Sequence, residues 1–301
     1  MKIAIAAPSP VPFTIGGAEN FWWGLVKAIN DHTSHQAELI KLPCPEDDFW
    51  SIIKSYEQFS RLDLSHFDMV ISTKNPAWMI EHPNHICYMQ HRLRGFYDFY
   101  PPDMPLHCRT DFQPAASILE YMVLNRESRR ALSEFFDRLQ GLKNNPDLPG
   151  DIVQMPGPFS RSAIHFLDSI GLSPKKIVSF AAISKTIALR KDYFPQHIKA
   201  EVIHHPSTLP EFHNGKYDYL FTASRLSPPK RIGLFIEAMK LVQSPVKLLI
   251  AGTGPQESYL KDLAKNDPRI KFLGFVKDSE LIDYYADALC VLFAPYDEDY
   301  G

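Results

Sequence analysis

Short apolar runs alternate with stretches of helical spacing along most of this chain, and this alternation limits the folds open to it. In the first half, strand-like runs lie at residues 2–7, 37–42, 68–72 and 85–90. A helix is expected from about residue 18, because Phe21, Leu25 and Ile29 recur at helical spacing. Alternating strands and helices predict a parallel sheet with helices on both faces.

The same alternation starts again after residue 205. Strands are expected at residues 217–223, 246–251, 270–273 and 288–294, and helices at 230–242 and 278–286. The run at 288–294 is apolar throughout, which predicts a strand buried on both faces. A chain of 301 residues also favours two domains over one. We therefore predict an α/β protein with one Rossmann-like domain at residues 1–205 and a second at residues 206–301.

The middle of the chain is less regular. We expect one long helix at residues 115–139, then a loop rich in Asn, Pro and Gly at 141–157, and a helix at about 162–170. A strand at 177–182 precedes a helix that starts at Ser184, because serine is a favoured N-cap residue. Glu46, Asp47 and Asp48 predict another helix start, with acidic residues at its cap and in its first turn.

Composition excludes some classes of function. The net charge is −3 and there is no basic tract, so no nucleic-acid partner is expected. No segment approaches the roughly 20 apolar residues that a membrane helix needs, and the apolar start is too short for a signal peptide. The four cysteines lack paired spacing, which indicates reduced thiols in a cytoplasmic protein.

Two cations flank the turn after the strand expected at 217–223. Arg225 lies at the carboxyl end of that strand, and Lys230 is expected in the first turn of the next helix, where it would oppose the helix dipole. Two cations beside free helix N–H groups are typical of a phosphate site. The alternative is a pair of solvated surface charges, which are common before helices.

Two further features lie after strands of the first half. Gly16 and Gly17 open the first helix, where glycine lets a backbone approach a ligand, although a tight turn explains them equally well. A Gly-x-Gly-x-x-Gly dinucleotide fingerprint is absent after the first strand. His91 follows the strand at 85–90 and could bind a polar substrate. The alternative is a structural histidine, with the neighbouring Arg92 and Arg94 simply solvated.

Together these segments resemble the retaining glycosyltransferases of the GT-B fold, family four, over most of the chain. Residues 16–19 match the family's Gly-Gly-x-Glu turn, and Arg225 with Lys230 match its Arg and Lys, five positions apart, that bind the donor diphosphate. Residues 248–255 look like its Gly-x-Gly-Pro turn. Residues 270–276 look like its next strand, whose end touches the nucleobase. Residues 295–301 resemble the start of a motif with two glutamates, and Glu298 would be the first of them.

The resemblance implies two Rossmann-like domains facing each other across a cleft, and transfer of a sugar from a nucleotide diphosphate sugar to an acceptor hydroxyl with retention of configuration. His91 and Glu298 would be catalytic through hydrogen bonds to the donor sugar. Gly16 would lie on the acceptor side. The residues expected to bind the donor are Gly17, Arg225, Lys230, Phe275, Val276, Tyr300 and Gly301.

No cofactor beyond the donor is expected, and no metal, because two cations would neutralise the diphosphate. Asp297, Glu298 and Asp299 offer the alternative of a metal site. His82 and His85 are poorly spaced for one and are interpreted as structural.

The expected partners are the nucleotide sugar and an acceptor glycan or lipid-linked acceptor, in polysaccharide or glycan biosynthesis. Trp22 and Trp23 could meet a lipid-linked acceptor or the inner face of a membrane, although core packing accounts for at least one of them.

The family's second glutamate and last strands are missing after Gly301. The second domain is therefore expected to be incomplete, the coding sequence to continue, and this fragment by itself to be inactive. Two alternatives stay open. The first is a GT-B-type sugar-nucleotide epimerase, which needs no acceptor. The second is a non-catalytic remnant that binds a nucleotide.

Overall fold

The chain consists of two compact units, residues 1–207 and residues 208–301. The computed structural model describes residues 1–13, 15–206, 209 and 212–300. Each unit contains its own parallel sheet and its own buried apolar clusters. The boundary expected from the sequence, after residue 205, lies close to this division.

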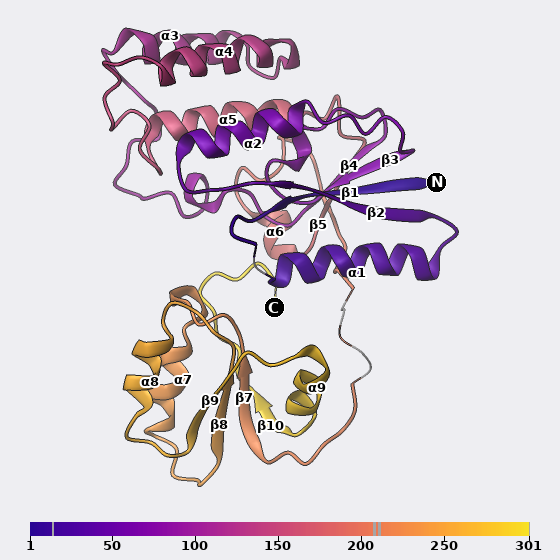
Figure 1. Ribbon diagram of the computed structural model, residues 1–301, viewed down its shortest axis with the longest axis vertical. Coiled ribbons are helices and arrows are strands. Elements are labelled where there is room, and N and C mark those ends of the chain that lie inside the picture. Colours follow the sequence, from indigo (N-terminus) through magenta and orange to yellow (C-terminus); the bar gives the residue numbers. More distant parts are fainter. Residues whose placement is uncertain (14, 207–208, 210–211, 301) are drawn as a thin grey trace. The chain divides into compact units, whose positions relative to one another are not determined.

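The first unit is built on a six-stranded parallel sheet (Figure 1). The strands lie side by side in the order β2-β1-β3-β4-β5-β6. The short β6 was not expected from the sequence. The bounds are β1 (Lys2–Ser9), β2 (Gln36–Pro43), β3 (Met69–Ser72), β4 (His85–Met89), β5 (Ser179–Ala182) and β6 (Glu201–Val202).

Helices cover both faces of this sheet, as the alternating pattern predicted. Figure 1 shows α1 and α6 on one side and α2 and α5 on the other, with α3 and α4 packed together beyond α5. Their bounds are α1 (Gly17–His32), α2 (Phe49–Ser60), α3 (Gln113–Leu124), α4 (Leu132–Lys143), α5 (Pro158–Gly171) and α6 (Lys185–Leu189). Three short 3₁₀ turns complete the unit, η1 (Ala77–Met79), η2 (Arg94–Phe96) and η3 (Arg129–Ala131).

The single helix expected at residues 115–139 is wrong, because the structure has two helices there. The chain breaks between α3 and α4, where Glu127 takes a left-handed backbone conformation with φ of 63°. An α-helix cannot continue through such a residue. The loop expected at 141–157 also begins later, because α4 runs to Lys143.

Local signals at two helix starts are confirmed. Asp48 caps α2, since its Oδ1 accepts a hydrogen bond from the Ser51 N–H at 2.8 Å. Ser184 caps α6 in the same way through the N–H of Ile187. Such caps satisfy backbone donors that the first turn of a helix leaves unpaired.

The tryptophan pair of α1 divides between core and surface. Trp22 is 1% exposed and belongs to the main core cluster, whereas Trp23 is 40% exposed. Packing therefore explains one of the two indoles, as expected from the sequence.

The second unit is a four-stranded parallel sheet with helices on both faces. Its strands are ordered β10-β7-β8-β9, and Figure 1 shows α7 and α8 on one side and α9 on the other. The bounds are β7 (Tyr219–Ala223), η4 (Pro228–Lys230), α7 (Ile232–Met239), β8 (Lys247–Ala251), α8 (Glu257–Ala264), β9 (Ile270–Gly274), α9 (Asp278–Ala286) and β10 (Ala288–Val291).

The expectation that the run at 288–294 is a strand buried on both faces is wrong. β10 ends at Val291, and Leu289, Val291 and Phe293 are 59%, 46% and 55% exposed. The reason is topological. β10 pairs only with β7 in the described chain, so it is an edge strand and not an interior one.

Across the residues described, no helix combines the length and the apolar character needed to cross a membrane.

Candidate functional site

The second sheet has a topological switch point between β7 and β10. From β7 the chain proceeds through β8 to β9 and then returns to the other side of β7 for β10, with all pairs parallel. In open α/β sheets, ligands bind beyond the carboxyl ends of the strands at such a point. The loops there contain Arg225, Lys230 and Glu298. Three of the residues expected at the site therefore lie at one edge of one sheet.

Lys230 and Glu298 are in direct contact. The Lys230 Nζ donates to Glu298 Oε2 in an ion pair, and the two side chains are 29% and 27% exposed. A backbone hydrogen bond of 2.7 Å from the Tyr296 N–H to the Pro229 carbonyl joins the same two loops. The cation expected on the diphosphate and the carboxylate expected on the sugar are thus neighbours.

The expectation that Lys230 lies in the first turn of the following α-helix is wrong. Lys230 ends the 3₁₀ turn η4, and α7 begins only at Ile232, after Arg231 takes a left-handed conformation with φ of 54°. Pro228 and Pro229 lack N–H groups and favour a turn over a regular helix start. Lys230 therefore does not oppose the dipole of α7, and what favours a phosphate beside it is its place at the switch point.

The Arg225 side chain is exposed and forms no hydrogen bond or ion pair within the described part of the chain, while the Arg225 carbonyl oxygen accepts from the Ser227 N–H at 2.9 Å. The segment that carries it is held by the loop after β8. Gly252 has φ of +120°, and a Cβ there would lie 1.9 Å from the Ser224 carbonyl oxygen. A Cβ on Gly254 would lie 2.4 Å from the Leu226 carbonyl oxygen. The two glycines of the Gly-x-Gly-Pro turn therefore allow the close backbone contact that fixes the segment around Arg225.

Phe275 and Val276 follow β9 and line a cavity of about 370 Å³. Phe275 is 79% exposed. Three acidic side chains, Glu280, Asp283 and Asp287, share this cavity, but neither Lys230 nor Glu298 lines it. The contact of Phe275 and Val276 with a nucleobase stays a prediction.

The end of the described chain holds the remaining residues expected at the donor. Tyr300 is 37% exposed, and Asp299 beside it is buried. Gly301 lies outside the described residues. No group of three or more His, Cys, Asp or Glu side chains suited to a metal ion occurs among the residues that the structure describes.

Gly16 and Gly17 lie at the start of α1, at the carboxyl edge of the first sheet. Gly16 is the N-cap, and its N–H donates to the buried Glu19 carboxylate at 3.0 Å. Glu19 of the Gly-Gly-x-Glu turn therefore caps the helix. A Cβ on Gly17 would meet no atom within 4 Å, so packing within the chain does not require glycine at this position.

His91 follows β4 at the same edge. Its ring is half-buried, and its Nδ1 lies 2.8 Å from the Arg92 carbonyl oxygen. Burial, with the nearby Lys74, lowers the pKa of His91 to about 3. The ring is therefore neutral at neutral pH.

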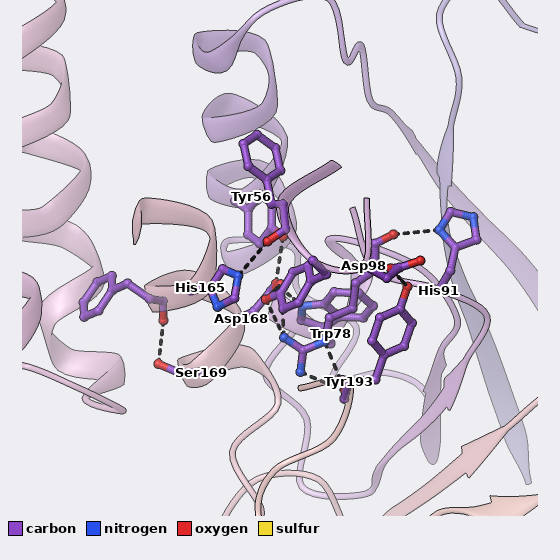
Figure 2. A network of polar contacts seen from close by, with 12 residues as sticks. Tyr56, Trp78, His91, Asp98, His165, Asp168, Ser169 and Tyr193 are labelled. Carbon is purple, nitrogen blue, oxygen red and sulfur yellow. Dashed lines mark hydrogen bonds and ion pairs between the residues drawn. The ribbon is translucent and has the colours of Figure 1, made fainter. Parts of the chain in front are cut away.

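The interpretation of Arg92 as a solvated charge is wrong. Arg92 is 6% exposed, and its NH1 lies 3.4 Å from Oδ2 of the fully buried Asp168 (Figure 2). Figure 2 shows Tyr56 and Trp78 turned toward the same carboxylate, to which they donate at 2.7 and 2.8 Å. Buried charges persist in proteins when they are paired and fully hydrogen-bonded.

Sequence reasoning missed Asp168, although a signal was present. It lies on the apolar face of α5, at helical spacing from Ile164 and Gly171, both of which are buried. An acidic residue in such a stripe needs partners, and these come from distant segments that no local pattern identifies.

Comparison with known proteins gives a family match over part of the chain and a similar fold over the whole chain. Residues 210–301 match the family of glycosyl transferases group 1. A search of curated proteins finds no match. Sucrose-phosphate synthase from Thermosynechococcus elongatus has a similar fold, with a TM-score of 0.56 and 11% identity over 100% of this chain and 77% of that chain.

Two other solved structures are similar at lower scores. The Anabaena protein HepE, in complex with UDP-glucose, has a TM-score of 0.49 and 13% identity, over 98% of this chain and 74% of that chain. WaaG, a glycosyltransferase involved in lipopolysaccharide biosynthesis, has a TM-score of 0.48 and 11% identity, over 98% of this chain and 75% of that chain.

The two Rossmann-like units, each with its parallel sheet, give this chain the GT-B fold. Within that class, residues 210–301 match the model of the glycosyl transferases group 1.

Proposed function

We propose that the protein transfers a sugar from a nucleotide diphosphate sugar to an acceptor hydroxyl, with retention of configuration at the anomeric carbon. The donor diphosphate would lie against Arg225 and Lys230. Their positive charge would stabilise the negative charge that grows on the leaving group. Electrostatic stabilisation of this kind is commonly a large part of catalysis.

One observation carries this proposal. In a unit that matches the glycosyl transferases group 1, the loops at the topological switch point of the sheet contain Arg225, Lys230 and Glu298, and Lys230 pairs with Glu298. The guanidinium and ammonium groups suit phosphate oxygens. The Glu298 carboxylate suits sugar hydroxyls, because it can only accept hydrogen bonds at neutral pH.

Residues of the first unit are assigned to the same reaction by their motifs. His91 would bind a hydroxyl of the donor sugar, and the Gly17 N–H would assist the diphosphate. Phe275, Val276, Tyr300 and Gly301 would complete the donor site, and Gly16 would face the acceptor. The acceptor would be a glycan or a lipid-linked sugar. HepE, which was solved with UDP-glucose, suggests UDP-sugars as the first donors to test.

Calorimetry with UDP and with GDP tests the binding half of the proposal. We expect one of the two to bind at one site, and Lys230→Ala to weaken that binding. Lys240→Ala is the matched control, since Lys240 also pairs with a glutamate of the same unit, Glu237. The proposal fails if neither nucleotide binds, or if Lys230→Ala binds as the wild type does.

Incubation of the protein that the complete coding sequence specifies with a nucleotide sugar alone separates the proposed reaction from its alternatives. A retaining transferase releases a little free sugar to water, and proton NMR of the first product should show the anomer of the donor. A sugar-nucleotide epimerase would instead change the sugar while it stays on the nucleotide. Nucleotide binding without either product would favour the non-catalytic alternative. Release of the opposite anomer would exclude retention.

A further inference from the structure

Among the described residues, the His91 ring has one hydrogen-bond partner, the Arg92 carbonyl oxygen, and that partner determines where its proton lies. Nδ1 is 2.8 Å from the Arg92 carbonyl oxygen, which can only accept a hydrogen bond. Nδ1 therefore carries the hydrogen of the neutral ring, and Nε2 keeps a lone pair. In this tautomer Nε2 can accept a hydrogen bond from a hydroxyl group but cannot donate one.

The residue that supplies this carbonyl is fixed through its own side chain. The Arg92 Nε and NH2 donate to the Tyr193 carbonyl oxygen at 3.1 and 2.8 Å, and NH1 donates to the Tyr97 hydroxyl at 2.5 Å. All three guanidinium nitrogens thus donate hydrogen bonds, either to Tyr97 or to the distant Tyr193. Rotation of the backbone at Arg92 would break these contacts together.

Asp168 completes this anchor from α5. Its Oδ2 accepts from the Tyr97 hydroxyl at 2.6 Å, while Oδ1 accepts from Tyr56 and Trp78. Asp168 is fully buried, so its charge is sustained only by these donors and by the Arg92 guanidinium. Figure 2 shows the carboxylate at the centre of this network, with His91 at its edge.

We propose that Arg92, Tyr97 and Asp168 are positioning residues, which hold His91 in the tautomer whose unprotonated Nε2 can accept a hydroxyl of the donor sugar. This proposal deepens the proposed function and rests on it only for the identity of the hydroxyl. A network that served stability alone would have no reason to act on the His91 ring.

The charged groups near His91 are Lys74, Arg94 and Asp98. Asp98 is itself paired with Arg94 and Arg190, at 2.6 and 3.1 Å. Lys74 and Arg94 disfavour a second proton on the ring and Asp98 favours it, so a shift of the segment that carries His91 would change both its tautomer and its titration.

Nitrogen-15 NMR of the histidine rings tests this proposal without any substrate. The His91 signals are assigned by their loss in His91→Gln. In the wild type we expect a protonated Nδ1, a bare Nε2 and no titration between pH 5 and pH 8. Asp168→Asn should mix the two tautomers and bring a midpoint into this range.

Tyr97→Phe keeps the test decisive if Asp168→Asn does not fold, because it removes only one hydroxyl from the network. Tyr121→Phe is its matched control, since it loses a similar bond to the Ala131 carbonyl between α3 and α4. We expect Tyr97→Phe, and not Tyr121→Phe, to alter the His91 signals and to lower kcat about tenfold, with nucleotide affinity unchanged.

The proposal is overturned if wild-type His91 carries its proton on Nε2 or titrates near pH 6.5. It is also overturned if the folded Tyr97→Phe protein leaves the His91 signals as they are in the wild type. If the variants alter the His91 signals but the wild-type protein binds no nucleotide, the positioning role is supported and the proposed function is rejected. Failure of the positioning proposal can therefore be told apart from failure of the proposed function.

Discussion

At the scale of single residues, the ion pair between Lys230 and Glu298 is the contact that most affects how the site would work. Both side chains are more than a quarter exposed, so their attraction is worth only about 0–1 kcal/mol. A diphosphate carries more negative charge than one carboxylate and can replace Glu298 beside Lys230. Glu298 would then be left to accept hydrogen bonds from the sugar.

Arg225 gives the first prediction at this scale. Arg225→Ala should weaken binding of the nucleoside diphosphate about 10- to 100-fold, because a hydrogen bond to a charged group contributes about 1.5–3 kcal/mol. Arg225→Lys should also weaken it, since lysine lacks the planar fork that grips two oxygens. Calorimetry measures both variants. Arg231→Ala, which removes an exposed arginine from the same loop, is the control. Equal losses in Arg231→Ala would point to a general charge effect and against a specific role of Arg225.

Glu298 gives the second prediction. Glu298→Gln should lower kcat at least about tenfold, because the neutral amide is a weaker acceptor for sugar hydroxyls. Nucleotide affinity should stay the same or rise, since Lys230 loses its competing partner. Activity of the wild type should survive EDTA. Glu237→Gln, which also removes the partner of a lysine, should leave kcat unchanged.

The alternative for Glu298 is a divalent cation held by residues 297–299, and it predicts the opposite pattern. Activity would be lost in EDTA and would return with magnesium or manganese. Glu298→Gln would then also weaken nucleotide binding. Either result would reject the assignment of Glu298 to the sugar.

At the scale of elements, the loop after β8 supports the loop after β7. The Leu226 N–H donates to the Thr253 carbonyl oxygen at 2.9 Å, and the Gln256 N–H donates to the Leu226 carbonyl oxygen at 3.0 Å. These backbone bonds need the close approach that the glycines allow. The Gly-x-Gly pattern is therefore explained here by packing between two loops, without contact to any ligand.

Gly252→Ala tests this explanation. Its φ of +120° and the 1.9 Å approach to the Ser224 carbonyl oxygen mean that an alanine must displace the segment carrying Arg225. We expect a loss of stability of about 1–3 kcal/mol in the second unit, with weaker nucleotide binding. Urea unfolding followed by circular dichroism, together with calorimetry, measures both effects.

Gly233→Ala is the control for this prediction. Gly233 lies in α7, and a Cβ there would make an ordinary contact of 3.6 Å with Leu263. Alanine in a helix should stabilise the unit by about 0.5–1 kcal/mol. If Gly252→Ala is as stable as Gly233→Ala and binds nucleotide normally, the packing explanation is wrong.

At the scale of the whole molecule, the first unit buries histidines that the unfolded chain would protonate. Burial, aided by His82, lowers the pKa of His85 to about 3. Burial also lowers the pKa of His165 to about 4. His85 Nε2 lies 2.8 Å from the Ser72 hydroxyl, and His165 Nε2 lies 2.9 Å from the Phe96 carbonyl oxygen. Both rings are thus neutral parts of the folded structure, which supports the interpretation of His85 as structural.

These histidines predict that the first unit loses stability in mild acid. The folded pKa of His85 lies below its unfolded value of about 6.5, so the unfolded chain binds more protons as the pH falls. The stability is present above about pH 6.5 and declines from there toward pH 3. Between pH 7 and pH 5 the loss should be about 2 kcal/mol for a histidine such as His85.

Tryptophan fluorescence can measure this loss in the first unit alone, because all four tryptophans lie at residues 22, 23, 50 and 78. His85→Gln will destabilise the unit at pH 7, but it should reduce the further loss on going to pH 5. His107→Gln changes an exposed histidine of the same unit and should leave the loss of stability between pH 7 and pH 5 unchanged. An equal pH dependence in wild type and His85→Gln would contradict the prediction.

Most elements and the chemistry of the candidate site follow from local sequence patterns. Hydrophobic periodicity reports which face of a segment is buried, so it located every strand of the two sheets except the short β6, and the inward face of α1. Local cap signals located the starts of α2 and α6. Charged residues and glycines after strands marked Arg225, Lys230, Glu298 and His91, because the carboxyl ends of parallel strands lie at one edge of a sheet.

Strand order and the meeting of distant groups became known from the folded structure alone. Sequence patterns do not report strand order, so the edge position and exposure of β10 could not be foreseen. The contact between Lys230 and Glu298 could not be foreseen either, because it depends on β10 returning beside β7. Arg92 reads as a surface charge in the sequence. Arg92 can be buried because Asp168, 76 positions away, pairs with it and offsets the free-energy cost of removing the guanidinium from water.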